Sequence, residues 1–288
     1  MNPFFQNDYV TLYNGDSFEI VPQLGKGIFD AVITDPPYGT TQLAWDVKID
    51  FRKMHEMIRN AGKRNAARLV FCTMPMAVDV AAAARDEFRY ELIWEKTQKQ
   101  GFLNAKKMPL RAHENIFVFY SALPTYNPIK FKAETPRHAV HHGKNGKRSE
   151  MYIGRVRHNS VSDTKPGIQH PKCKSIIEAN YTYVDDGSRY PTDIIKVSNW
   201  NGSLFGMVKR LNHPTAKPVI LLQYLVSTFT NEGDTILDPF GGGGSTAVAA
   251  MLRRRKCVIV EREERYCEMT AKRLEKVQER FAAQFTRH

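Results

Sequence analysis

The stretch that decides the fold runs from Thr235 to Thr246 and reads TILDPFGGGGST. It begins with a short apolar run typical of a buried strand, passes through four consecutive glycines, and ends where a helical pattern begins. Four glycines in a row exceed what a plain strand-to-helix turn needs, so they indicate backbone pressed against a bound ligand. Because open α/β sheets bind ligands at the carboxyl ends of their strands, we expect an α/β protein with its site at that edge.

Two familiar phosphate-binding loops do not match these glycines. A nucleotide triphosphatase P-loop needs a lysine before the Ser/Thr, and Gly244 stands in that place. A dinucleotide-binding fingerprint needs its third glycine where this chain has Thr246. About one strand later, an apolar run ends in Glu261, and an acidic residue there suits the two hydroxyls of a ribose. The combination favours a nucleoside-bearing cofactor without a pyrophosphate.

Short apolar runs alternate with helical patterns on both sides of a middle region, residues 121–212. This alternation predicts an α/β fold with a doubly wound, mostly parallel sheet of seven strands interleaved with helices. The strands are expected at Tyr9–Tyr13, Phe29–Thr34, Arg68–Cys72, Tyr90–Trp94, Ile116–Tyr120, Thr235–Leu237 and Cys257–Val260. The helices are expected at Phe51–Ala61, Met76–Asp86, Lys217–Thr230 and Ser245–Leu252, and from about Glu263 towards Phe285.

The charge of the chain indicates a polyanionic partner. Its 288 residues contain 42 Lys and Arg against 30 Asp and Glu, a formal net charge of +12. Residues 121–212 contain 15 of the basic and 7 of the acidic residues, so they carry a surplus of 8 of those 12 charges. The same stretch is rich in proline and histidine, and it is predicted to be an irregular, basic insertion with short strands.

The cysteines and the apolar runs exclude other classes of protein. The four cysteines include no C-x-x-C pair and have no His-x-x-x-His nearby, which argues against a disulfide scaffold and a zinc site, so no metal is expected. No apolar run approaches the roughly 18 to 20 residues that a membrane-spanning helix needs. Residues 1–10 lack the basic and apolar regions of a secretion signal. We therefore expect a cytoplasmic protein.

A second strand end carries the sequence Asp35-Pro36-Pro37-Tyr38. Consecutive prolines hold the backbone extended and remove two N–H donors, which leaves carbonyl oxygens as acceptors. Asp35 adds a carboxylate and Tyr38 a flat ring. The loop therefore suits a planar group bearing an NH₂, held through its two hydrogens and stacked on its face. For an isolated Asp-Pro-Pro, a plain turn is the alternative.

Together, Asp-Pro-Pro-Tyr at 35–38 and Asp-Pro-Phe-Gly-Gly-Gly-Gly-Ser-Thr at 238–246 resemble the catalytic and cofactor motifs of the amino-group DNA methyltransferases. These enzymes use S-adenosyl-L-methionine. The order, with the catalytic motif first and the glycine loop last, resembles the β class of that family. The resemblance implies a class I methyltransferase-like fold with a catalytic half at 1–120, a target-recognition insertion at 121–212 and a cofactor-binding half at 213–288. Supporting segments are Asn14–Ser17, Trp94–Lys96, His113–Ile116 and His213–Pro218.

The resemblance also implies roles for individual residues. Glu261 would bind the ribose, Asp16 would lie near the adenine amino group of the cofactor, and Lys217 and Ser245 would contact its carboxylate or sugar. For Asp16, an ordinary turn residue after a strand is the alternative. The target base would be held by Asp35, Pro36, Pro37 and Tyr38. The cofactor would be bound by Asp16, Thr215, Lys217, Asp238, Pro239, Phe240, Gly241, Gly243, Ser245, Thr246, Glu261 and Arg262.

DNA contacts are expected at a few residues outside these motifs. In the basic insertion they are Lys144, Lys147 and Arg148. Trp45 follows the catalytic motif and fits a mobile lid or a wedge, with an anchor in the core as an equal alternative.

The implied reaction moves a methyl group from S-adenosylmethionine to the N6 amino group of adenine in double-stranded DNA, by base flipping and direct in-line transfer. Within the family, Asp at the first motif position favours adenine and Ser favours cytosine; cytosine-N4 stays open. Cytosine-C5 methylation is excluded because the chain has no Pro-Cys step. An inactive DNA-binding module of the same fold also stays open, as does methylation of RNA or of protein glutamine. A homodimer and a pairing with a restriction enzyme are the partners considered besides DNA.

Overall fold

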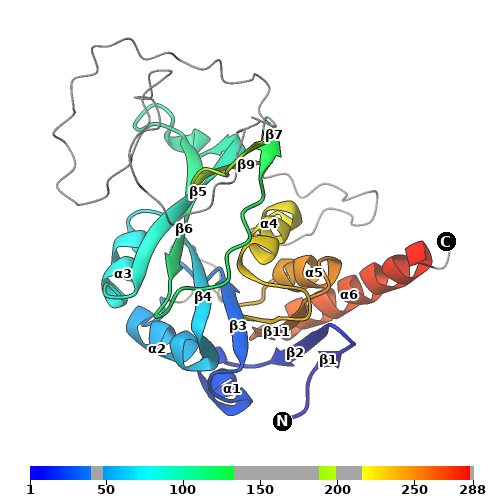
Figure 1. Ribbon diagram of the computed structural model, residues 1–288. Coiled ribbons are helices and arrows are strands. Elements are labelled where there is room, and N and C mark those ends of the chain that lie inside the picture. The colour runs from blue at the N-terminus through cyan, green and yellow to red at the C-terminus, as the bar shows by residue number, and fades with distance from the viewer. Residues whose placement is uncertain (40–47, 133–187, 199–215, 286–288) are drawn as a thin grey trace, which may run out of the picture. The chain divides into compact units, whose positions relative to one another are not determined.

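The computed structural model describes residues 1–39, 48–132, 188–198 and 216–285 (Figure 1). The described residues divide into two units, the first within 1–129 and 192–285, and the second comprising 130–132 and 188–191. Five residues singled out above lie outside the described part, so nothing is concluded about their surroundings. They are Trp45, Lys144, Lys147, Arg148 and Thr215.

The first unit is built on a nine-stranded sheet in the order β1-β2-β11-β10-β3-β4-β6-β5-β9. Strands β2, β11, β10, β3 and β4 are parallel, β6 runs antiparallel between β4 and β5, and β9 is parallel to β5. The sheet is therefore mostly parallel. Its strands are β1 (Phe5–Gln6), β2 (Val10–Asn14), β3 (Phe29–Thr34), β4 (Gly62–Cys72), β5 (Phe88–Gln100), β6 (Arg111–Phe119), β9 (Ile194–Val197), β10 (Thr235–Asp238) and β11 (Lys256–Glu261).

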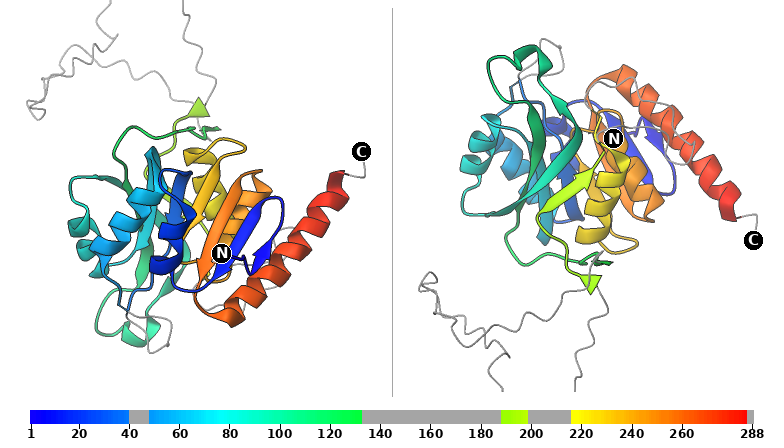
Figure 2. Two further views of the ribbon diagram at one scale, coloured as in Figure 1. Left: turned by 90° about the horizontal axis from the view of Figure 1, so that it is seen from below. Right: turned by 90° about the horizontal axis from the view of Figure 1, so that it is seen from above.

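Helices cover both faces of this sheet (Figure 2). Apolar side chains of α1, α2 and α3 pack in one buried cluster, and those of α4, α5 and α6 pack in the other. Strands such as β3 and β10, buried over most of their length, contribute to both clusters, as expected for a sheet covered on two sides. The helices are α1 (Ser17–Leu24), α2 (Phe51–Ala61), α3 (Met76–Ala83), α4 (Val219–Phe229), α5 (Ser245–Leu252) and α6 (Glu264–Phe285).

The predicted fold class is confirmed, and all seven predicted strands and five predicted helices are present. The bounds of β3, α2 and α5 are as predicted, and the other elements have shifted ends. The sheet has two further strands at its edges, β1 and β9, which were not predicted because runs of two and four residues carry little periodic signal. Helix α1 was missed, since Pro22 inside its eight residues weakens a helical pattern. Strands β5 and β6 are longer than the apolar runs that predicted them. Their outer ends were not predicted because the residues there are polar and exposed.

The second unit is described only at its two ends. There β7 (Phe131–Lys132) pairs with β8 (Ser188–Arg189) in an antiparallel ladder, and the Lys130 ammonium lies 4.7 Å from the centre of the Tyr190 ring. The predicted insertion at 121–212 therefore stays a prediction. None of the helices in the described ranges is long and apolar enough to cross a membrane.

Candidate active site

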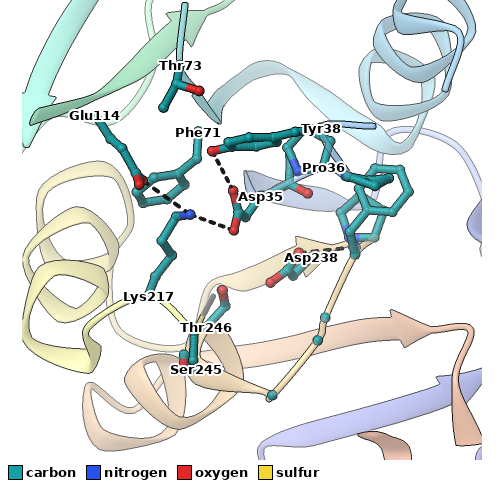
Figure 3. A pocket seen from close by; sticks show the side chains of 18 of the residues that line it. Asp35, Pro36, Tyr38, Phe71, Thr73, Glu114, Lys217, Asp238, Ser245 and Thr246 are labelled. Atoms are coloured by element: carbon teal, nitrogen blue, oxygen red, sulfur yellow. Dashed lines mark hydrogen bonds and ion pairs between the residues drawn. The ribbon is translucent and has the colours of Figure 1, made fainter. Parts of the chain in front are cut away.

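The two Asp-Pro elements end neighbouring strands of the sheet, β3 and β10. The helices that follow leave to opposite faces, α2 to one and α5 to the other. Such a switch point leaves a crevice outside the strand ends. A cavity of about 610 Å³ lies there, lined by residues from the ends of β2, β3, β4, β10 and β11 and from the β5–β6 hairpin (Figure 3). The predicted catalytic and cofactor motifs therefore share one cavity.

Asp35 is the centre of a hydrogen-bonded cluster in this cavity (Figure 3). The Tyr38 hydroxyl donates to Asp35 Oδ1 at 3.0 Å, and Lys217 Nζ lies 2.7 Å from Asp35 Oδ2. Burial raises the pKa of Asp35, although the charge of Lys217 opposes this shift. Burial and the charge of Asp35 likewise raise the pKa of Tyr38 well above its ordinary value, so Tyr38 stays a hydroxyl donor.

The cluster continues away from Asp35 as a chain of alternating charges. Lys217 Nζ also lies 3.2 Å from Glu114 Oε2, and Glu114 Oε1 pairs with Lys96. Lys96 Nζ in turn donates to Gln100 Oε1 at 2.7 Å. Lys217, Glu114 and Lys96 are all buried, and removing one partner of a buried pair leaves a charge uncompensated. The four charged groups therefore depend on one another.

The pKa values of the cluster reflect this dependence. Burial alone would lower the pKa of Lys217, but the carboxylates of Asp35 and Glu114 outweigh it and the pKa is raised. Burial alone would raise the pKa of Glu114, but the two lysines lower it. Lys217 and Glu114 therefore both stay charged at neutral pH.

Aromatic rings and prolines complete this side of the cavity. Lys217 Nζ lies 5.6 Å from the centre of the Tyr38 ring and 5.2 Å from that of Phe71, within the range of cation–π attraction. Pro36 is buried, Pro37 is half-buried, and both line the cavity beside Tyr38. The four residues predicted to hold a base therefore lie together around one carboxylate.

The glycine loop forms the opposite side of the cavity. A Cβ on Gly241 would come within 3.3 Å of Ile259 Cβ and of the Val260 carbonyl oxygen, so the loop lies tightly against β11. Gly244 has a φ of +69°, and a Cβ there would collide with the side chain of Thr270. At both positions, only glycine fits without displacing a neighbour. The glycines therefore fix the path of the loop as well as leaving room for a ligand.

Asp238 is a buried carboxylate at the start of this loop. The Phe240 N–H donates to Asp238 Oδ1 at 3.2 Å. Burial raises the pKa of Asp238 to about 7, against hydrogen bonds from Thr246 and the Phe240 backbone. Asp238, Pro239, Phe240 and Gly243 all line the cavity.

Glu261 ties the glycine loop to the end of β11. Its Oε2 accepts a hydrogen bond from the Gly242 N–H at 2.7 Å, and its Oε1 accepts one from the Glu263 N–H at 2.8 Å. Both carboxylate oxygens retain lone pairs that a further donor can use. The predicted contact with a ribose stays a prediction, and the structure adds a second role in holding the loop.

Asp16 and Ser245 also have partners within the protein. Asp16 caps helix α1 by accepting a hydrogen bond from the Phe18 N–H at 2.7 Å, as an N-cap aspartate does. Buried Arg273 donates to the Gly243 carbonyl oxygen at 2.6 Å and to Ser245 Oγ at 3.1 Å. Asp16, Ser245 and Arg262 nevertheless line the cavity, and their contacts with a cofactor stay predictions.

Several residues of the site were not predicted from the sequence. Glu114 and Lys96 stood in segments that supported the resemblance, but neither was assigned a role. No local signal separated them from solvent-exposed charges, because Glu114 stands between His113 and Asn115, and Lys96 between Glu95 and Thr97. Phe71 and Arg273 gave no signal either. Within the described residues, no group of three or more His, Cys, Asp or Glu side chains could hold a metal ion.

The comparison with protein families decides what this cavity belongs to. The profile of a DNA methylase family, N6_N4_Mtase, matches residues 29–272, a range that includes both Asp-Pro elements. The chain belongs to this DNA methylase family. The predicted cofactor is confirmed with it, because this family takes its methyl group from S-adenosylmethionine. Membership does not separate adenine-N6 from cytosine-N4 enzymes, nor does it assign the β class.

Individual relatives of this DNA methylase are bacterial. It is 42% identical to the Type II methyltransferase M2.DpnII of Streptococcus pneumoniae over 78 residues. This match covers 26% of this chain and 29% of that protein. It is 23% identical over 287 residues to the Type II methyltransferase M.ScaI of Streptomyces caespitosus, covering 95% of this chain and 84% of that protein.

Solved structures share its fold. The PvuII DNA methyltransferase, described as cytosine-N4-specific, has a TM-score of 0.64 at 15% identity, over 96% of this chain and 93% of that one. The complex of M1.HpyAVI with SAM has a TM-score of 0.54 at 20% identity, over 92% of this chain and 99% of that one. These similarities support the class I methyltransferase-like fold of this DNA methylase.

Proposed function

We propose that this DNA methylase transfers a methyl group from S-adenosylmethionine to the exocyclic N6 atom of adenine in double-stranded DNA. The observation that carries the proposal is the position of Asp35 between Tyr38 and Lys217, in the cavity that it shares with the glycine loop. Aspartate as the first residue of the catalytic motif supports adenine over cytosine. The Type II description of M2.DpnII and M.ScaI supports a restriction-modification role in the cytoplasm, beside a restriction enzyme.

The target amino group is a weak nucleophile because its lone pair is delocalised into the ring. Asp35 and the Pro36 carbonyl would accept its two hydrogens and orient the nitrogen, while Tyr38 stacks on the flipped base. Bound S-adenosylmethionine supplies an electrophilic methyl group. As the nitrogen becomes positively charged, the Asp35 carboxylate offsets that charge and accepts the proton that the nitrogen releases. Burial favours this last step, since it raises the pKa of Asp35 above that of an ordinary carboxyl group.

Lys217 is better suited to positioning Asp35 than to binding the cofactor. Its ammonium bridges Asp35 and Glu114 and lies against the faces of Tyr38 and Phe71. This arrangement supports a role in keeping Asp35 ionised and oriented. The cofactor itself would be held by the residues of the opposite side, with Asp238, Phe240 and Gly241 at its methionine part and Glu261 at its ribose.

Glu261→Ala tests the cofactor side. We expect it to weaken binding of S-adenosylmethionine by about 1.5–3 kcal/mol, because it removes a charged hydrogen-bond acceptor and releases the Gly242 N–H. Isothermal titration calorimetry measures the affinity, and Glu268→Ala, which removes an exposed carboxylate paired with Lys272 on α6, is the matched control. Equal affinities of the unchanged chain and Glu261→Ala would remove Glu261 from the cofactor site.

The reaction itself is tested by the base that becomes modified. The chain is expressed in a methylation-deficient host, and plasmid DNA is analysed by modification-sensitive sequencing and by nucleoside mass spectrometry. We expect N6-methyladenine at one recurring sequence, which also identifies the recognition site. N4-methylcytosine would replace the adenine assignment, and unmodified DNA despite normal binding of S-adenosylmethionine would indicate an inactive DNA-binding module or a substrate other than DNA.

A further inference from the structure

The β5–β6 hairpin extends from the rim of the cavity and has an unusually apolar tip. Gln100 and Arg111, the last ladder pair before the tip, both line the cavity. Figure 1 shows the hairpin continuing past the ends of β3 and β4. In the tip, residues 101–110, Phe102 is 72% exposed and Leu103 is 101% exposed. Large apolar side chains on a solvent-exposed turn contribute nothing to the core, which points to contact with another molecule.

The charge around Phe102 and Leu103 indicates what kind of molecule the hairpin tip contacts. Residues 97–113 contain four Lys and Arg and no Asp or Glu. Lys106 and Lys107 lie within the tip and are exposed. A basic loop ending in apolar side chains fits a nucleic-acid duplex, whose phosphates attract the lysines and whose base steps accept an apolar wedge. An acidic or purely apolar protein surface would satisfy only one of these features.

We propose that the hairpin tip is a DNA-insertion element, in which Leu103 enters the base stack beside the flipped target base and Lys106 and Lys107 contact the flanking phosphates. The proposal rests on the proposed function, because the cavity must receive a base from a duplex. An extruded base leaves a gap in the stack, and filling that gap offsets part of the unstacking cost. Since Gln100 and Arg111, which flank the tip, line the cavity, the tip lies next to the place where the gap forms.

The lysines are tested by the salt dependence of DNA binding. Lys106→Gln with Lys107→Gln removes two phosphate contacts, so the slope of log affinity against log salt should become shallower by about 1.8. Lys26→Gln with Lys256→Gln is the matched control, because these exposed lysines stand at the amino ends of β3 and β11, at the opposite edge of the sheet. An unchanged slope in the hairpin variant, or an equal change in the control, would overturn the phosphate contacts.

Insertion is tested with 2-aminopurine at the target position of a duplex carrying the recognition sequence. Leu103→Ala should lower the fluorescence gain on binding and reduce the single-turnover rate about tenfold, while affinity for S-adenosylmethionine is unchanged. Leu103→Met should keep both signals. Ile28→Ala is the control, since Ile28 is 43% exposed, precedes β3 at the amino end of that strand, and lies outside both the cavity and the predicted insertion.

The outcomes separate this proposal from the proposed function. If the unchanged chain methylates DNA and Leu103→Ala flips and methylates equally well, the insertion element is wrong and the function stands. If Leu103→Ala instead changes only the sedimentation of the DNA-free protein, the tip contacts a second copy of the chain and the proposal is also wrong. If the unchanged chain modifies no DNA, the proposed function fails and this inference fails with it.

Discussion

Asp35→Asn is expected to fold, to bind S-adenosylmethionine with unchanged affinity, and to methylate duplex DNA at least about a hundredfold more slowly. The amide keeps the shape of the side chain and one acceptor oxygen. It removes the negative charge that offsets the positive charge forming on the target nitrogen, and it removes the atom that accepts the released proton. Because this interaction strengthens as the reaction proceeds, the loss should appear in the rate of methyl transfer rather than in binding.

Single-turnover methyl transfer, with enzyme and cofactor both saturating, isolates that step. Asp35→Glu is a useful companion, since it keeps the charge but moves the carboxylate away from Tyr38 and Lys217. Asp30→Asn is the matched control, because Asp30 lies on β3, the strand that Asp35 follows, and pairs with Lys63 outside the cavity. A rate for Asp35→Asn equal to that of the unchanged chain would mean that the Asp-Pro-Pro-Tyr loop is structural, and Asp35 would no longer be the catalytic residue.

Lys217→Met should lower the rate about tenfold or more near neutral pH and change its pH dependence. Burial already raises the pKa of Asp35, and Lys217 opposes that rise. Without the ammonium, the pKa of Asp35 rises further, so more of it is protonated and inactive at a given pH. The acidic limb of the pH–rate profile should therefore move to higher pH, and raising the pH should restore part of the lost rate.

Lys217→Arg keeps the positive charge, so the acidic limb of its pH–rate profile should lie at the same pH as in the unchanged chain. Comparing the two variants separates the effect of the charge from the effect of side-chain packing. Circular dichroism and thermal unfolding establish whether Lys217→Met still folds, since Glu114 keeps its pair with Lys96 in that variant. A pure increase in KM for S-adenosylmethionine, with an unmoved pH profile, would return Lys217 to the cofactor site and exclude a positioning role.

The sequence predicted those parts of the molecule whose signal lies within a few consecutive residues. Strands such as β3 are short apolar runs, and the two Asp-Pro elements carry their chemistry at the end of such a run. Glu114 and Lys96 were missed because their roles arise only when β5 pairs with β6 and Lys217 arrives from more than a hundred residues away. Buried charges of this kind are satisfied by tertiary partners, which local periodicity does not reveal.

The same limit affected the interpretation of single residues. Asp16 was assigned near the cofactor with an ordinary turn as the alternative, and the structure shows both an N-cap and a position on the cavity wall. Glu261 was assigned to a ribose, and its bonds to the Gly242 and Glu263 N–H groups could not be foreseen without the path of the glycine loop. A motif predicted where a residue lies more reliably than it predicted the partners of that residue.

The order of strands in the sheet has a consequence for how the chain is synthesised. β10 and β11 lie between β2 and β3, although they are separated from them by some two hundred residues of chain. While the ribosome is still translating the middle of the protein, β2 and β3 therefore have no strand to join them, and contacts of such long sequence separation form late. The wall of the cavity is incomplete until Glu261, at the end of β11, has left the ribosome. A polypeptide released prematurely would thus possess the Asp-Pro-Pro-Tyr loop but neither a place for the methyl donor nor a continuous sheet, and its unpaired strand edges would mark it for proteolysis.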